Sequence, residues 1–202
     1  MTAQLSVPDN DENARLKRII RAAEEAFKRV GFRAVTMEMV AREAHVAKAT
    51  LYTHFSNKDA LYLAVCARMA RLLRGAVERA LAQPETPLDA RLAEAVIAKH
   101  RMVFALVRGS AHAAELFSYK DAMAGEIFAG LDAAILKALA DAMAGDAQLA
   151  PNAGRLARAL YLGGADLASR SAAAAEMENE LADFAAVHLA GARALAAKES
   201  KT

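Results

Sequence analysis

Apolar side chains recur every three or four residues along most of this sequence. The first such stripe is Leu16, Ile19, Ala23, Phe27 and Val30, which is the spacing of one face of an α-helix. The chain is rich in alanine, and only 4 prolines and 10 glycines occur in its 202 residues. Alanine favours helices, and proline and glycine are the residues that end them. The sequence therefore predicts an all-α fold.

Capping and breaking residues indicate where these helices begin and end. Thr36 is suited to cap a short helix, and Ser56 opens a Ser-x-x-Asp pattern ahead of a long one. Pro84 and Pro87 mark a break between two helices. The predicted helices span about 12–30, 36–44, 47–55, 57–81, 87–108, 111–117, 120–144, 151–174 and 176–197.

Composition excludes several classes of site. The single cysteine, Cys66, cannot form a disulfide within the chain or a thiolate-rich metal centre. Paired Glu-x-x-His motifs, a nucleophile elbow and a phosphate-binding glycine loop are absent from the sequence. We therefore expect neither an enzyme, nor a cofactor, nor a metal site. The polar N-terminus and the short uncharged runs predict a cytoplasmic protein without a membrane span.

Charge is unevenly distributed along the chain. Residues 1–80 contain 14 Lys and Arg against 9 Asp and Glu, whereas residues 81–202 contain 12 against 15. The two parts therefore carry net charges of +5 and −3. This asymmetry indicates that the first part meets an anionic partner.

Two short helices joined by a tight corner, in this basic part of the chain, have the outline of a helix-turn-helix. The second of them would enter the major groove of double-stranded DNA. No acidic residue lies between Ala44 and Asn57. The side chains on its exposed face can reach phosphates or base edges; they are Lys48, Ala49, Thr50, Tyr52, Thr53 and His54.

Residues 36–61 resemble the DNA-binding signature of the TetR family of transcriptional regulators. The most specific part is Thr50-Leu51-Tyr52-x-His54-Phe55-x-x-Lys58-x-x-Leu61. The resemblance implies that Thr36, Tyr52 and Lys58 contact phosphates. It places Lys48, Ala49, Thr50, Thr53 and His54 near base edges. Two residues depart from the family pattern, because His45 stands where glycine is usual and Ala47 stands where a capping serine is usual.

The resemblance also implies a domain organisation and a mode of action. A DNA-binding domain at 12–58 would be followed by a helical effector-binding and dimerisation domain at 59–198. The protein would be a homodimer, most often a repressor, that a small-molecule effector releases from a palindromic operator. We name candidate effector-binding residues, which are Phe104, Arg108, His112, Phe117, Tyr119, Met123 and Asp166. The candidate dimer interface comprises Leu156, Leu160, Gly163, Gly164, Leu167, Phe184 and Val187.

Two other interpretations remain open at this point. Basic stretches are often simply solvated faces, and the aromatic and methionine residues of the second part could be ordinary core. A helical small-molecule-binding protein without specific DNA recognition is the alternative function. The altered corner residues His45 and Ala47 are its only support in the sequence.

Overall fold

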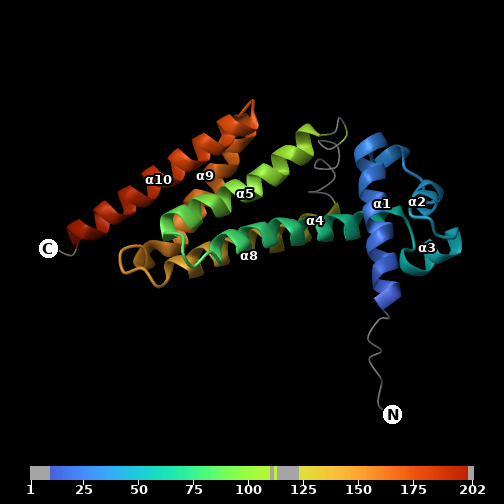
Figure 1. Cartoon of the computed structure of the whole chain (residues 1–202), viewed down its shortest axis with the longest axis horizontal. Coiled ribbons are helices and arrows are strands. Elements are labelled where there is room, and N and C mark those ends of the chain that lie inside the picture. Colours follow the sequence, from blue (N-terminus) through green and yellow to red (C-terminus); the bar gives the residue numbers. More distant parts are fainter. Residues whose placement is uncertain (1–9, 110–111, 113–122, 200–202) are drawn as a thin grey trace, which may run out of the picture. The chain divides into compact units, whose positions relative to one another are not determined.

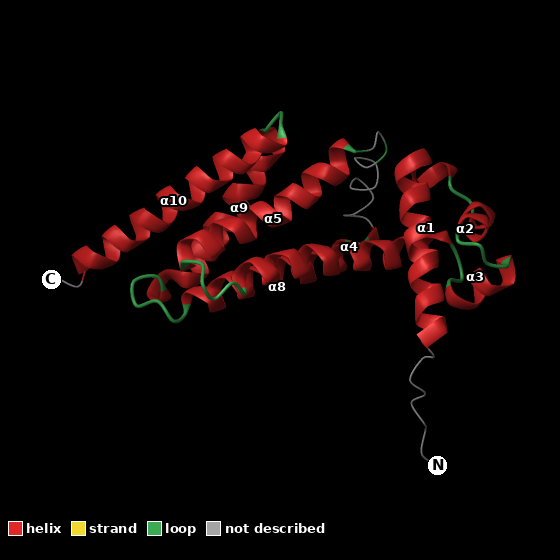
Figure 2. Ribbon diagram, viewed as in Figure 1, coloured by secondary structure: helices red, strands yellow, loops and turns green. Residues whose placement is uncertain are grey.

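The structure is a computed structural model that describes residues 10–109, 112 and 123–199. These residues form helices joined by short turns (Figure 1), and the described part of the chain contains no β-strand (Figure 2). The prediction of an all-α fold is confirmed. None of the helices within the described ranges has the length and apolar character needed to cross a membrane.

The described residues divide into two compact units. Unit 1 contains residues up to Met69, together with the described part of 109–125, and unit 2 contains residues 70–108 and those from 126 onward. The predicted domain boundary at residue 58 is the start of α4 (Lys58–Leu81). Unit 1 extends further because Leu61, Tyr62 and Val65, in the first turns of α4, are buried.

Unit 1 is built from α1 (Asn10–Ala34), α2 (Met37–Glu43), α3 (Lys48–His54) and the first part of α4. Helix α1 is interrupted at Gly31, where the backbone has φ 81°, a conformation that glycine adopts without steric cost. The predicted stop at this glycine is therefore observed as a kink. The rings of Phe27, Phe32 and Tyr62 pack with centroids 5.1–6.0 Å apart, and this cluster joins α4 to α1.

Unit 2 contains the rest of α4, α5 (Leu88–Arg108), α8 (Gly125–Met143), the 3-10 turn η1 (Ala150–Asn152), α9 (Ala153–Arg170) and α10 (Ala174–Glu199). Helix α10 packs against α5 and α9, and α5 also contacts α9 (Figure 1). The core side chains of these helices are largely leucine, isoleucine and alanine. The predicted helix at 111–117 lies outside the described residues, apart from His112.

Arginines on α5 and α10 connect elements of unit 2 that are distant in sequence. The guanidinium of Arg193 lies 2.7 Å from Asp89 Oδ1 and 2.9 Å from Asp146 Oδ2. Arg101 makes a two-pronged contact with Glu178, with N···O distances of 2.6 and 3.0 Å. The paired geometry fixes α10 on α5, because a guanidinium matches a carboxylate only in one plane.

Candidate nucleic-acid interface and effector site

The corner between α2 and α3 is a Schellman motif with His45 at the position that usually holds glycine. The amide of Val46 donates to the carbonyl oxygen of Ala41 at 3.0 Å, and the amide of His45 donates to that of Arg42 at 3.2 Å. This pair of bonds defines the motif. His45 has φ 52°, in the left-handed region where a Cβ costs about 1 kcal/mol. The corner therefore requires a left-handed backbone at position 45, and histidine adopts this conformation only at a cost in free energy.

Helix α3 is anchored through two side chains four residues apart. Leu51 and Phe55 are both buried in unit 1, as their helical spacing predicts. Ala47 precedes the helix in extended conformation and supplies no side-chain hydrogen bond to its first turn. The helix therefore depends on this apolar anchor, since the usual serine cap is missing.

The opposite face of α3 is open to solvent. Lys48, Ala49, Tyr52 and Thr53 are exposed, and Thr50 and His54 are half-buried. Thr53 Oγ1 donates to the carbonyl oxygen of Thr50 at 2.7 Å, which leaves its oxygen lone pairs as acceptors. A row of short polar side chains and one phenol beside a cation is suited to the edges and phosphates of a DNA groove.

Lys48 does not stand alone on this face. Its ammonium forms an ion pair with Glu38 from the first turn of α2, and it lies 5.9 Å from the centroid of the Tyr52 ring. The hydrogen bond with Lys48 lowers the pKa of Glu38, and the same bond raises the pKa of Lys48. Sequence reasoning missed Glu38, because ten residues of chain separate it from its partner.

Thr36 caps α2 as its sequence position predicts. Its Oγ1 accepts from the amide of Met39 at 3.2 Å, and this contact uses the oxygen as an acceptor. Its hydroxyl also hydrogen-bonds to the Glu38 carboxylate. A contact of Thr36 with a phosphate stays a prediction.

Lys58 makes contacts within the chain that the sequence did not predict. Its Nζ donates to the carbonyl oxygens of Phe32, Val35 and Arg33 at 2.9, 3.0 and 3.1 Å, and it lies 4.6 Å from the centroid of the Phe32 ring. A lysine ammonium has three protons, and these carbonyls use all of them. In the structure Lys58 therefore closes the end of α1 onto the start of α4, and its contact with a phosphate stays a prediction.

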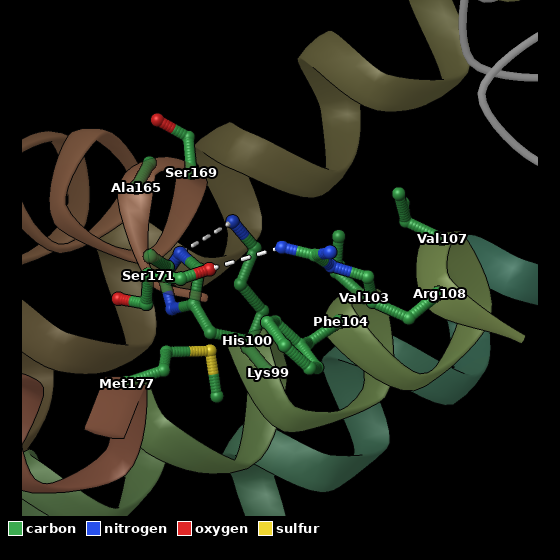
Figure 3. A pocket seen from close by; sticks show the side chains of 11 residues that line it. Lys99, His100, Val103, Phe104, Val107, Arg108, Ala165, Ser169, Ser171 and Met177 are labelled. Carbon is green, nitrogen blue, oxygen red and sulfur yellow. Dashed lines mark hydrogen bonds between the residues drawn. The ribbon is translucent and has the colours of Figure 1, made fainter. Parts of the chain in front are cut away.

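The candidate effector residues are only partly brought together. Phe104 and Arg108 line a cavity of about 310 Å³ within unit 2 (Figure 3). Asp166 is exposed, does not line this cavity, and pairs with Arg170 at 2.7 Å. His112 and Met123 belong to unit 1, and Phe117 and Tyr119 lie outside the described residues. Sequence reasoning missed the polar residues Lys99, Ser169 and Ser171, which line the cavity together with His100.

The candidate dimer residues separate into two groups. Leu160 and Gly164 are buried, and a methyl group on Gly164 would come within 2.9 Å of Val96 Cγ1 in the same chain. A methyl group on Gly163 would lie 2.4 Å from Cζ of Phe184. These contacts hold α9 against α5 and α10 within the chain, and the place of these residues in a dimer interface stays a prediction. Leu156 and Leu167 are half-buried, whereas Val187 is 69% exposed.

Titratable groups offer no metal centre within the described ranges, because no three His, Cys, Asp or Glu side chains converge there. Cys66 is buried beside Tyr62, and burial raises the pKa of its thiol. A thiol with a raised pKa is less available as a thiolate nucleophile.

Three helices, a Schellman corner and an exposed polar face on the last helix define a helix-turn-helix domain. Residues 19–65 match the family model described as bacterial regulatory proteins, tetR family. Residues 19–65 therefore form a DNA-binding domain similar to that of the TetR family.

Relatives and solved structures extend the comparison. An uncharacterized helix-turn-helix regulator of Bacillus subtilis, YhgD, is 31% identical over 93 residues, which are 46% of this chain and 44% of that protein. The chain thus spans less than half the length of this curated relative. A TetR-like regulator from Rhodococcus sp. RHA1 has the same fold, with a TM-score of 0.63 and 22% identity, over 92% of this chain and all of that one. FadR of Bacillus subtilis, solved in complex with stearoyl-CoA, has a TM-score of 0.58 at 19% identity, over 84% and 96% of the two chains.

Proposed function

We propose that this protein is a cytoplasmic, sequence-specific DNA-binding regulator, a repressor that a small-molecule effector releases from a palindromic operator. The observation that carries the proposal is α3 itself. Leu51 and Phe55 hold one face of the helix in the core, while Tyr52 and its polar neighbours face solvent. A helix presented in this way, in the basic part of the chain, has the geometry of a major-groove reader.

The size of the DNA site and the surface of unit 2 support a homodimer. One helix-turn-helix covers few base pairs, and a two-fold dimer places two of them about 34–36 Å apart, one turn of DNA. On α9 and α10 the large apolar side chains Leu162, Val187 and Leu195 are 53, 69 and 62% exposed. Val187 and Leu195 also line a groove with Leu156 and Ala159. Exposed apolar groups of this kind favour a second copy of α9 and α10 as the partner.

An effector would act by binding two conformations of the dimer unequally. If the effector prefers the conformation in which the two α3 helices are wrongly spaced, the affinity of the protein for the operator falls. The factor is the ratio of the effector's affinities for the two conformations. The cavity in unit 2 is the candidate site. FadR, which shares this fold, binds stearoyl-CoA, and this supports an effector role for the second unit.

The experiment that tests the proposal selects DNA sequences from a random library with the purified protein. Fluorescence anisotropy then measures the affinity for the selected sequence and for a scrambled one across a salt series. We expect a palindromic site, a preference of at least about 10³-fold and a steep salt dependence. Equal, weak binding of both DNAs would overturn the proposal and favour a helical ligand-binding protein without DNA recognition.

Single substitutions distinguish the phosphate contacts from the contacts with base edges. Tyr52→Phe removes one hydroxyl and is expected to weaken all DNAs equally, whereas Thr50→Ala is expected to change the preference among sequences. Lys137→Ala is the matched control, because Lys137 is exposed on α8 and pairs only locally with Asp141. This control should leave both affinities unchanged.

A further inference from the structure

Glu38 is an acidic residue on the surface that would meet DNA in the proposed function. It lies in the first turn of α2, two residues after the N-cap Thr36, and α2 packs against α3 (Figure 1). Every DNA phosphate carries a negative charge, so a carboxylate at this place opposes the binding of any sequence. The other acidic residue of α2, Glu43, pairs with Arg29 of α1 at 2.6 Å. Tight binding to DNA in general therefore gives no reason for a glutamate at position 38.

The carboxylate of Glu38 holds two of the side chains that the resemblance assigns to DNA. The ammonium of Lys48, the first residue of α3, forms an ion pair with it. The hydroxyl of Thr36, the N-cap of α2, hydrogen-bonds to it as well. One carboxylate thus links a residue expected at a phosphate with a residue expected at a base edge.

This ion pair adds little to the stability of the fold. The side chains of Lys48 and Glu38 are 55 and 59% exposed, and water and salt screen an ion pair that is this open. The position of α3 is fixed instead by Leu51 and Phe55, which are buried in unit 1. An effect of Glu38 is therefore expected on what α3 binds rather than on whether it folds.

Lys48 keeps donors for DNA while it is paired. Its Nζ donates to Oε1 of Glu38 and lies 5.9 Å from the centroid of the Tyr52 ring. A lysine ammonium has three protons, so further protons can be donated to a base edge. The acceptors on base edges, such as N7 and O6 of guanine, are neutral. They can bind Lys48 without separating it from Glu38.

A phosphate beside Lys48 meets a different situation, because it carries a full negative charge and would lie close to the Glu38 carboxylate. The hydrogen bond from Lys48 lowers the pKa of Glu38, so this carboxylate is ionised at physiological pH. The two negative charges repel each other, most strongly at low salt. Glu38 therefore opposes a phosphate at Lys48 and leaves a base edge free to bind there.

We infer that Glu38 is a specificity-determining residue, which positions Lys48 for base edges and opposes its use as a general phosphate ligand. The inference rests on the proposed function, because it names a residue that sets the specificity of the same DNA site. Specificity often comes from an interaction that works against the wrong partner. Glu38 lowers the affinity for the selected DNA slightly and the affinity for other DNA more strongly.

The test compares Glu38→Gln with the unchanged protein, both as the full chain. Glutamine retains an acceptor for Thr36 and removes the charge. Fluorescence anisotropy across a salt series measures the affinity for the selected DNA and for a scrambled one. At low salt we expect the variant to bind scrambled DNA at least about 10-fold more tightly, with a smaller gain for the selected DNA. The preference for the selected DNA should therefore fall at least about 2-fold.

The salt dependence gives a second readout, which a merely structural role of Glu38 would not change. Once its charge is removed, Lys48 is free to pair with a phosphate of scrambled DNA. The salt slope for scrambled DNA should then steepen by about 0.9 for each α3 that is bound. The slope for the selected DNA should stay the same, because Lys48 remains at a base edge there.

Two further comparisons show whether Glu38 acts through Lys48. Glu43→Gln is the matched control, because it removes the same charge from the same helix at a residue that pairs with Arg29 instead. This control should leave the preference between the two DNAs unchanged. In a Lys48→Met protein, Glu38→Gln should no longer alter the preference or the salt slope, since its partner is gone. Urea unfolding checks that each variant is folded.

Failure of this inference is distinguishable from failure of the proposed function. If the protein selects a DNA and Glu38→Gln leaves its preference and salt slopes unchanged, the regulator is sustained and the inference about Glu38 is overturned. Equal changes in Glu38→Gln and Glu43→Gln would also overturn the inference, because net charge alone would account for them. A protein that selects no DNA would overturn both.

Discussion

The ammonium group of Lys58 lies 2.9 Å from the carbonyl oxygen of Phe32 and 4.6 Å from the centroid of the Phe32 ring. Carbonyls in the last turn of a helix have no partner within it. Lys58, the first residue of α4, satisfies two such groups at the end of α1, the carbonyls of Phe32 and Arg33, and also the carbonyl of Val35 just after the helix. The lysine of the DNA-binding motif is thus a cap between two helices.

Replacement of Lys58 distinguishes its role as a helix cap from a contact with a DNA phosphate. Lys58→Met keeps the aliphatic stem and removes the charge and its three bonds. Because a hydrogen bond to a charged group contributes about 1.5–3 kcal/mol, we expect the free energy of unfolding in urea to fall by about 2 kcal/mol. The salt dependence of DNA binding by the folded variant should not change, whereas loss of one phosphate contact would lower the slope by about 0.9.

The control for this measurement is Lys48→Met. It makes the same chemical change on the exposed face of α3, where the lysine contacts Glu38 and Tyr52. This control should leave stability nearly unchanged and weaken DNA binding. If Lys58→Met lowered the salt slope without loss of stability, Lys58 would be a phosphate ligand after all.

The left-handed backbone of His45 leads to a prediction about stability. Glycine adopts φ near 52° without a Cβ clash, so His45→Gly should raise the free energy of unfolding by about 1 kcal/mol. His45→Ala retains the Cβ and should give no such gain. Thermal or urea unfolding of the three proteins at one pH measures the difference. A glycine variant no more stable than the alanine variant would show that the corner carries no strain.

Glu38 provides a prediction about DNA affinity. Its carboxylate is the ion-pair partner of Lys48, so a phosphate approaching α3 must displace it and also meets its charge. Glu38→Gln should therefore tighten binding to the selected DNA roughly 2- to 5-fold at low salt. Glu43→Gln removes the same charge from α2 but frees Arg29 instead. If both variants tightened binding equally, the effect would come from net charge alone.

Helical spacing was sufficient to predict much of the fold and the orientation of α3. Leu51 and Phe55 face the core because residues four apart share one face, and Gly31 interrupts α1 because its backbone needs positive φ. These are local properties of a short segment, and the sequence displays them directly.

Interactions between distant segments could not be predicted in the same way. Lys58 meets carbonyls 23–26 residues away, and only the fold brings Glu38 to Lys48. The small residues of α9 were also ambiguous. A helix face of small residues lets another helix approach closely, and the sequence does not show whether that helix belongs to the same chain or to a partner subunit. Gly163 against Phe184 and Gly164 against Val96 place these contacts within one chain.

His100 makes stability depend on pH. Burial first, and Lys99 second, lower its folded-state pKa from about 6.5 to about 4. Between these values the unfolded chain binds a proton that the folded protein does not, so stability falls as pH decreases from 6.5 toward 4 and is unaffected by this group above 6.5. His100→Asn retains a donor for the Val96 carbonyl without this titration. Between pH 7 and pH 5 the unchanged protein should lose about 2 kcal/mol more unfolding free energy than the variant in urea titrations. Equal losses would contradict the assignment.

Val187 on α10 tests the proposed dimer. Its side chain is 69% exposed in a single chain and lines a groove with Leu195, so a dimer through α9 and α10 would bury it. Val187→Glu would place a charge in that apolar contact and should raise the dimer dissociation constant at least about 10-fold, measured by sedimentation velocity. Leu72→Glu is the control, because Leu72 is an exposed apolar residue on α4. A Val187→Glu protein that dissociates no more readily than this control would move the dimer contact away from α10. If the dimer is lost, the affinity for a palindromic DNA should fall with it, because each half-site would then be bound alone.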